Sequence, residues 1–129
     1  MNREVKFRGK SKRTGEWLYG DLVRNVEGAF SIVPPFEMTT DNLCDRYEVD
    51  KKEIGQFSGL TDGNDTEIYE GDILARCVLK STFNYQIVFN NGAFCMKTSD
   101  DDFVPLMSIF MGSAIVKGNI YDNPELLKR

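Results

Sequence analysis

The stretch of residues 59–74, GLTDGNDTEIYEGDIL, places two chain reversals directly before an apolar strand. Asp62 and Gly63 lie in the first reversal, because aspartate can bond its own backbone and glycine tolerates positive φ. Gly71 and Asp72 form the second, at the entry to a run in which one alternating face is wholly apolar. We predict a structural corner at these four residues, followed by a strand with a buried face.

A second strong signal is the hairpin pattern in YQIVFNNGAFCMK. Two β-rich runs, Tyr85–Phe89 and Ala93–Lys97, flank the pair Asn91 and Gly92. These two residue types suit a type I′ turn, in which both central residues take positive φ. We therefore predict an antiparallel hairpin at this place in the chain.

Alternating apolar and polar residues occur throughout the chain, around Val5, Trp17 and Ile115 as well. The fold is therefore expected to be mainly β with little helix. From about Ile54 onward, the order of corner, strand, loop, hairpin and final strand is similar to a small SH3-like β-barrel, which N-terminal strands precede. The length of 129 residues indicates a single domain, residues 1–129, with an N-terminal β lobe at 1–50 and a barrel-like lobe at 54–129.

The apolar residues are spread too thinly for a membrane span. No run approaches the roughly 18 consecutive apolar residues that a helix needs to cross a bilayer. The opening MNREVKFRGKSKR also lacks the apolar centre of a signal peptide. We expect a cytoplasmic protein without a membrane partner.

The chain contains no histidine, which removes the commonest general base and the commonest transition-metal ligand. Its three cysteines are widely spaced and form no CxxC pair, so neither disulfides nor a zinc site are expected. Cys77 and Cys95 fall in apolar strand patterns and are predicted to pack in the core.

Two carboxylate groupings were weighed as sites. Asp62, Asn64 and Thr66 carry oxygens at alternate positions, as a calcium loop begins, but Glu67 and Ile73 replace its required glycine and bidentate glutamate. An acid and base pair among residues 67, 70 and 72 would lack a second catalytic group. We favour turn and solvent roles for these carboxylates, and expect no enzyme activity, no cofactor and no metal.

The opening of the chain is basic and the remainder acidic. Residues 1–24 contain seven basic and three acidic residues, a net charge of +4. Because the whole chain has a net charge of −4, residues 25–129 carry −8. Three interpretations remain open: nucleic acid at one end, head-to-tail subunit contact, or a solvated strand face. The candidate nucleic-acid contacts are the basic residues of the opening, Arg3, Arg8, Lys10, Lys12 and Arg13.

The aromatic residues near this basic stretch allow two interpretations. Phe7, Trp17 and Tyr19 could stack on bases, or they could pack in the core as alternating strand aromatics commonly do. We prefer the core, because Val5 and Phe7 share the predicted buried face. Apolar side chains in irregular stretches predict self-association as a homo-oligomer: Phe36, Met38, Leu43, Phe103 and Met107.

Three segments in order resemble the YopX-like proteins of phages and prophages: KFRGKSKRTGEWLYG, IGQFSGLTDGNDTEIYEGDIL and VKGNIYDNPELL. The resemblance spans nearly the whole chain and departs at Asp65, where the family commonly carries glycine. It implies a small, β-rich, phage-associated protein of the bacterial cytosol. It carries over no catalytic or binding residue.

Two hypotheses of function follow. The first is a non-enzymatic phage or prophage accessory protein that acts by protein–protein interaction, with a host or phage protein as its partner. The alternative is a nucleic-acid-binding module that uses the basic N-terminal stretch. Salt-sensitive retention on DNA or RNA separates them, because phosphate contacts release counterions and weaken steeply with salt.

Overall fold

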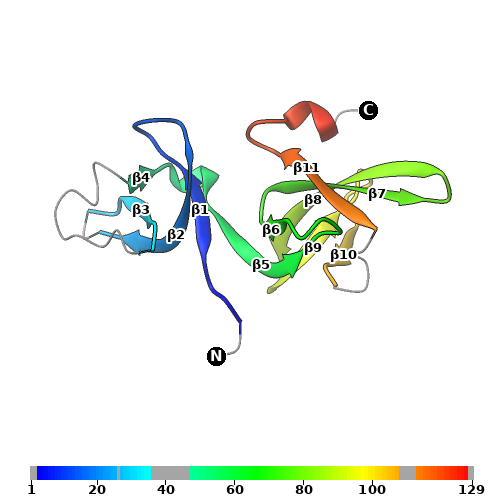
Figure 1. Ribbon diagram of the computed structural model, residues 1–129, viewed down its shortest axis with the longest axis horizontal. Coiled ribbons are helices and arrows are strands. Elements are labelled where there is room, and N and C mark those ends of the chain that lie inside the picture. The colour runs from blue at the N-terminus through cyan, green and yellow to red at the C-terminus, as the bar shows by residue number, and fades with distance from the viewer. Residues whose placement is uncertain (1–2, 26, 36–46, 108–112, 128–129) are drawn as a thin grey trace. The chain divides into compact units, whose positions relative to one another are not determined.

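The computed structural model describes residues 3–25, 27–35, 47–107 and 113–127 (Figure 1). Contacts divide the chain into two compact units, residues 1–57 and 58–129. The boundary between Phe57 and Ser58 lies within one strand, β5 (Gly55–Thr61).

Unit 1 is an antiparallel sheet in which the strand order is β4-β3-β2-β1-β5. A short 3-10 helix, η1 (Lys51–Glu53), joins β4 to β5, and the Asp50 carboxylate accepts from the Lys52 amide at 3.0 Å. Its other strands are β1 (Phe7–Lys10), β2 (Trp17–Arg24), β3 (Phe30–Val33) and β4 (Glu48–Val49).

The core of unit 1 forms where β1 passes close to β3 and β4. Ile32 and Val49 are almost fully buried, and a Cβ atom on Gly9 would lie within 3.1 Å of both side chains. Glycine at this position therefore lets β1 approach the two apolar residues. The alternation around Val5 predicted a first strand in this region, and the observed strand begins two residues later, at Phe7.

Unit 2 holds a second antiparallel sheet in which the order is β10-β9-β8-β7-β11. The second half of β5 pairs with β6 (Glu67–Tyr69), and a 3-10 helix, η2 (Pro124–Leu127), follows the last strand. The sheet strands are β7 (Asp72–Val78), β8 (Ser81–Asn90), β9 (Ala93–Lys97), β10 (Phe103–Pro105) and β11 (Ala114–Asn119).

One face of this sheet supplies the core of unit 2. Register places Leu74 beside Tyr85 and Ile87 beside Met96, so the alternating apolar residues gather on one side. Ile68 from β6 joins this cluster and is fully buried. The predicted strand after the corner is therefore confirmed, but not the face that was predicted to be buried. Ile73 and Leu74 are both buried at the start of β7, the cluster takes Leu74, and the predicted face ends in the exposed Cys77 and Leu79.

The predicted hairpin between β8 and β9 is also confirmed. Asn91 and Gly92 have φ values of 51° and 83°, the positive values that a type I′ turn requires. The chain is mainly β with little helix, as predicted: most of the described residues lie in strands, and η1 and η2 are short 3-10 segments.

The predicted SH3-like barrel is not confirmed. In the described residues, β10 and β11 lie at opposite ends of the strand order and the sheet stays open. The second edge of β11 is occupied by a turn: the Gly63 amide donates to the Ala114 carbonyl at 2.9 Å. This contact leaves that part of the edge unavailable to another strand.

The two cysteines that the structure describes differ in exposure. Cys95 is buried as predicted, whereas Cys77 is exposed, because it pairs with Thr82 near the end of the β7–β8 hairpin, beyond the core. Among the described residues, no helix is long and apolar enough to cross a membrane.

Candidate functional site

The predicted corner begins at Asp62, whose buried carboxylate binds three backbone amides. Oδ1 accepts from Asn64 at 2.8 Å and from Thr66 at 2.9 Å, while Oδ2 accepts from Val116 at 2.8 Å. The first two bonds close the turn after β5, and the third ties this turn to β11. Asp62 therefore joins segments that are 54 residues apart.

The electrostatics of Asp62 reflect two opposing causes. Burial raises the pKa of its carboxyl, but the three backbone N–H donors favour the charged form and together hold the pKa below its ordinary value. Both carboxylate oxygens of Asp62 thus accept hydrogen bonds from backbone amides. In the segment that resembles the start of a calcium loop, backbone amides therefore bind the Asp62 oxygens that would otherwise be available to a cation.

The second half of the corner is equally tied to the backbone. Asp72 is 1% exposed and accepts from the Tyr69 amide at 2.7 Å. Gly71 has a φ of 93°, its amide donates to the Ile87 carbonyl, and its carbonyl accepts from the Ile120 amide. The corner residues predicted from sequence therefore connect β6, β7, β8 and the segment after β11.

The basic residues predicted to contact nucleic acid do not form one exposed patch. Arg8 is only 6% exposed, and its guanidinium lies 4.9 Å from the centre of the Trp17 ring. Lys10 lies 5.6 Å from the same ring. Arg3 is exposed at the start of the described residues.

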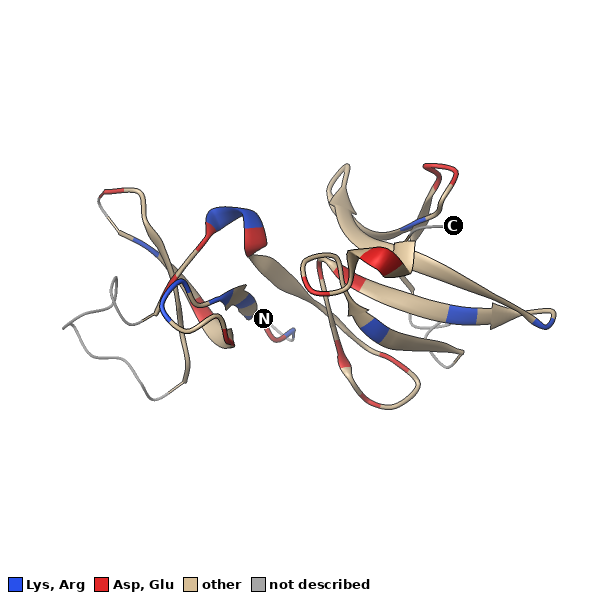
Figure 2. Ribbon diagram, turned by 90° about the horizontal axis from the view of Figure 1, so that it is seen from above, with Lys and Arg blue, Asp and Glu red and all other residues tan. Residues whose placement is uncertain are grey.

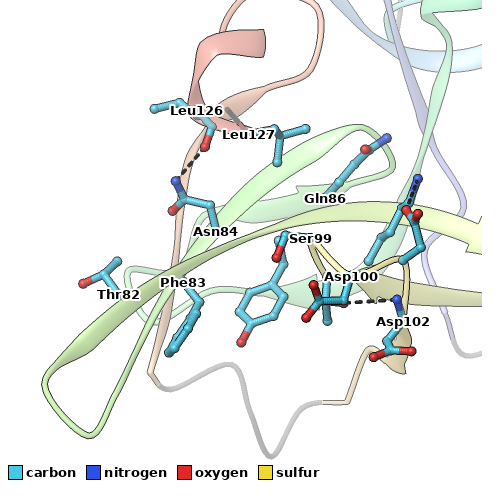
Figure 3. A pocket seen from close by; sticks show the side chains of 13 residues that line it. Thr82, Phe83, Asn84, Gln86, Ser99, Asp100, Asp102, Leu126 and Leu127 are labelled. Carbon is cyan, nitrogen blue, oxygen red and sulfur yellow. Dashed lines mark hydrogen bonds and ion pairs between the residues drawn. The ribbon is translucent and has the colours of Figure 1, made fainter. Parts of the chain in front are cut away.

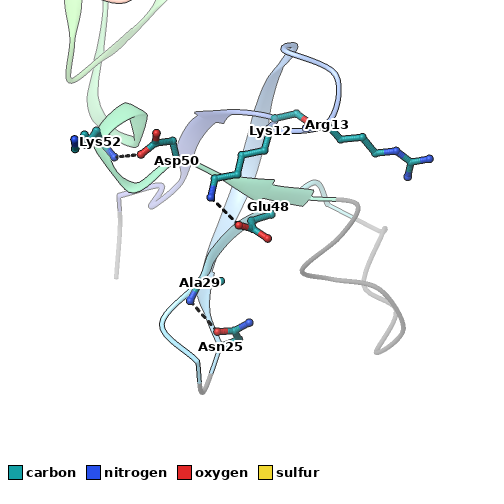
Figure 4. Close-up of polar contacts among 8 residues, drawn as sticks. Lys12, Arg13, Asn25, Ala29, Glu48, Asp50 and Lys52 are labelled. Atoms are coloured by element: carbon teal, nitrogen blue, oxygen red, sulfur yellow. Dashed lines mark hydrogen bonds and ion pairs between the residues drawn. The ribbon is translucent and has the colours of Figure 1, made fainter.

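The other two candidates, Lys12 and Arg13, lie in the turn after β1. Lys12 Nζ donates to Glu48 at 2.8 Å, and this bond together with the carboxylate charge raises the pKa of Lys12 (Figure 4). Arg13 points away from that ion pair (Figure 4). One of these two turn cations is therefore already paired within the chain.

A mixed row of cations and aromatic rings does run along one face of β2, β1 and β5. Lys6 Nζ lies 5.0 Å from the Phe57 ring, and Arg8 and Lys10 both lie over Trp17. Tyr19, opposite Arg8, is 46% exposed. Sequence analysis favoured a core position for Tyr19, and the structure places its ring at the surface.

Charge divides unevenly between the units. Residues 1–57 contain ten basic and ten acidic residues, whereas residues 58–129 contain six basic and ten acidic ones. Figure 2 shows residues of both signs in unit 1. The basic opening of the chain is therefore balanced within its own unit, and the excess negative charge belongs to unit 2.

Unit 2 contains an open groove of about 700 Å³ (Figure 3). Its walls come from β8, the start of the β9–β10 turn, and η2. Polar side chains of β8 meet two leucines from η2 and an acidic turn across this space. The residues that define it are Phe83, Asn84, Gln86, Leu126, Leu127 and the segment 100–102.

The two sides of the groove are held by specific hydrogen bonds. Asn84 Nδ2 donates to the Leu126 carbonyl at 2.8 Å, which fixes η2 against β8 (Figure 3). On the other side, the Asp102 amide donates to the Thr98 hydroxyl at 3.1 Å, and the Thr98 amide donates to the Asp102 carbonyl at 2.8 Å. A closed turn therefore presents the acidic residues.

The rim of the groove is negatively charged. The turn supplies Asp100, Asp101 and Asp102. Lys97 Nζ forms an ion pair with Asp101 Oδ1 at 3.4 Å. The rim therefore has two more carboxylates than ammonium groups. A partner that carries a cation gains from this field, especially at low salt.

A protruding turn lies beside the groove. The β7–β8 hairpin ends in Leu79 and Lys80, with φ values of 50° and 72°, and Leu79 is 94% exposed. Sequence analysis missed this turn, because neither residue type is typical of positive φ. The three consecutive aspartates were the one signal of the groove that was visible in the sequence.

The apolar residues predicted to drive self-association are placed only in part. Phe103 and Met107 are 44% and 49% exposed, whereas Phe36, Met38 and Leu43 lie outside the described residues.

Within the described part of the chain, no group of three or more His, Cys, Asp or Glu side chains is arranged to hold a metal ion.

Comparisons with known proteins agree with this fold. The crystal structure of protein EF1440 from Enterococcus faecalis is 27% identical, with a TM-score of 0.59, over 98% of this chain and 100% of that one. The crystal structure of YopX from Bacillus subtilis is 19% identical, with a TM-score of 0.62 over 98% of each chain, and at this identity the likeness shows the fold alone. None of the curated proteins compared with the chain matches it. The sequence model of the YopX protein family matches residues 6–128, so the chain belongs to the YopX family, as its three motifs predicted.

Proposed function

We propose that this YopX-family chain is a non-enzymatic accessory protein of a phage or prophage, which acts in the bacterial cytoplasm by binding another protein. The observation that carries this proposal is the groove of unit 2, where two leucines face an acidic turn across an open space. The phage association rests on the family resemblance.

The chemistry of the groove suits a polypeptide segment. Leu126 and Leu127 provide an apolar surface, Asn84 and Gln86 provide amide groups, and the acidic turn provides charge. Peptide recognition commonly combines apolar contacts with polar pairing at the edge of a groove. The fitting partner therefore carries an apolar side chain next to a lysine or arginine.

Binding of synthetic peptides tests this proposal. Peptides that contain adjacent leucine and lysine should raise the fluorescence anisotropy of a labelled probe, and peptides with glutamate for lysine should not. The triple variant Asp100→Asn, Asp101→Asn and Asp102→Asn should weaken binding by about tenfold or more, because it removes the attractive rim charge.

A matched control changes equally exposed carboxylates of unit 1. Glu16→Gln, Asp21→Asn and Glu27→Gln remove the same amount of negative charge at positions that are distant in sequence from the groove residues. These substitutions should leave peptide affinity unchanged. Equal loss in both triple variants would show that net charge alone governs the interaction. Unchanged binding in the groove variant would contradict the proposal.

A second candidate function, nucleic-acid binding, is favoured by the row of cations and rings in unit 1. Single-stranded nucleic acids are held by cations along the backbone and aromatic rings under the bases. Tyr19 is exposed enough to stack, and Lys10 lies two strand positions beyond Arg8 on the same face. This function ranks second, because Arg8 is buried and Lys12 is paired with Glu48.

Retention on single-stranded DNA or RNA tests this alternative. Tyr19→Ala and Lys10→Ala should each weaken retention, and affinity should fall steeply with added salt. Ile115→Ala, which truncates an exposed apolar residue of unit 2, serves as the control. Absence of salt-sensitive retention by the unaltered protein would remove this candidate.

A further inference from the structure

We infer that the partner of the groove includes a second copy of this chain. The β7–β8 turn of one copy enters the acidic groove of the other, and the contact is repeated in the opposite direction. This inference rests on the proposed function, since it names the occupant of the same groove.

The turn between β7 and β8 is unusual in its residue types. Leu79 and Lys80 both adopt left-handed backbone conformations, which strain residues that carry a Cβ. The chain uses Asn91 and Gly92 for the same geometry at the other end of β8, so the less suitable pair is not imposed by the fold. Strained turns persist where the turn itself has a role.

Leu79 is an apolar residue that is exposed to solvent. Its side chain is 94% exposed at the end of a hairpin that extends beyond the neighbouring strands (Figure 1). Phe83, four residues further along the same hairpin, is 48% exposed. Two large apolar side chains on one projecting hairpin gain by burial against another surface.

The turn and the groove are complementary in apolar surface and in charge. The turn presents one leucine followed by one lysine, and the groove presents Leu126 and Leu127 opposite three aspartates. Insertion brings Leu79 to the leucines and Lys80 to the acidic turn. Both the apolar and the charged parts of the contact are therefore matched within one sequence.

The contact between two copies is self-complementary. Asn84 lies in the groove and follows Lys80 by four residues, about 13 Å along a strand. When two hairpins lie antiparallel, each turn therefore reaches the groove beside the other turn. Such an isologous contact produces a two-fold dimer and leaves no unpaired site for further growth. Both surfaces belong to unit 2.

Sedimentation velocity on the full chain tests the inference through charge reversal. The unaltered protein should sediment as a dimer at micromolar concentration. Lys80→Glu should weaken the dimer by at least tenfold, because it places a carboxylate against the acidic rim. The double variant Asp100→Lys and Asp102→Lys should do the same, because its rim repels Lys80.

Mixing these two variants provides the decisive measurement. Each turn then meets a groove of opposite charge, so the mixture should form a heterodimer although each variant alone is monomeric. Lys117→Glu reverses an exposed charge on β11 and should dimerise like the unaltered protein. Thermal melting of each variant confirms that the comparison is made on folded protein.

The outcomes separate this inference from the proposed function. A monomeric unaltered protein, or a dimer that Lys80→Glu leaves intact, overturns the pairing. If the groove variant still loses its peptide ligands in that case, the proposed function stands and only the inference fails. If groove substitutions alter neither peptide binding nor dimerisation, both are wrong.

Discussion

The two turns at the ends of β8 have the same backbone geometry and opposite sequence character. Asn91 and Gly92 belong to residue types that adopt positive φ at low cost, whereas Leu79 and Lys80 do not. The first turn is specified by its own residues. The second is held by the pairing of β7 with β8, which runs from Ile73 beside Gln86 to the turn itself.

This difference shows how a strained turn is maintained. The pairing of β7 with β8 offsets the conformational strain of Leu79 and Lys80. The hairpin therefore forms although its turn residues destabilise it. Stability is then lower than the same backbone would allow with other residues. Substitutions at the two turns measure this cost directly, and two substitutions at a third turn extend the comparison.

The largest expected effect comes from giving the second turn the sequence of the first. Asn91→Leu combined with Gly92→Lys should lower the free energy of unfolding by about 2 to 3 kcal/mol, because each residue then adopts a left-handed conformation with a Cβ. Urea denaturation measures the change. A loss below about 0.5 kcal/mol would mean that positive φ costs little in this sheet.

Next in size is the turn that Asp62 holds. Asp62→Asn should cost about 2 kcal/mol, because an amide replaces one carboxylate oxygen with a donor that faces backbone N–H groups. Urea denaturation at neutral pH measures this difference. A cost near zero would mean that the three bonds are dispensable.

The same variant tests the pKa of Asp62. Because the folded pKa lies below the unfolded value of about 4, the carboxylate stabilises the fold fully above that pH. This contribution is lost as the pH falls through the folded pKa. The advantage of the unaltered protein over Asp62→Asn should therefore shrink on acidification and stay constant from pH 5 to 7.

A smaller effect of opposite sign is expected at the strained turn. Leu79→Asn combined with Lys80→Gly should raise the free energy of unfolding by about 1 to 2 kcal/mol, because it relieves both left-handed residues. The melting temperature should rise and dimerisation should weaken. A variant that is more stable and still dimerises would separate strain from association.

The smallest effect concerns Asp65, where the family commonly has glycine. Asp65 has a φ of 62°, so glycine fits its backbone without strain. Asp65→Gly should therefore stabilise the fold by about 0.5 to 1 kcal/mol in urea denaturation. Asn64→Gly, at a residue without positive φ, should give no gain and provides the control.

Sequence analysis succeeded where local chemistry and tertiary structure agree. The reversals at Asp62 and Gly71 and the turn at Asn91 combine suitable residue types with a following apolar alternation. The positive φ expected at Gly63 lies instead at Asp65. The same reasoning missed the turn at residues 79–80, because tertiary pairing imposes a conformation that its residue types disfavour. It also predicted a closed barrel, since a list of strands does not say what occupies the edge of β11.

The candidate site was less accessible from sequence. Its acidic turn was visible as three aspartates, but the leucine wall lies more than twenty residues away in η2, and one side-chain hydrogen bond brings it to β8. The burial of Arg8 could not be predicted either, because a strand pattern does not reveal whether an aromatic ring covers the polar face. Both features depend on contacts between distant segments.

The hydrogen bond from Asn84 to Leu126 also sets an order of events during translation. Leu126 and Leu127 follow every other residue of the groove, so a growing polypeptide makes its projecting hairpin before it makes the wall that receives one. A nascent chain can offer Leu79 to a finished neighbour but cannot accept a neighbour in return. In the proposed pairing, mutual engagement therefore waits until η2 has left the ribosome, which limits premature association on a polysome.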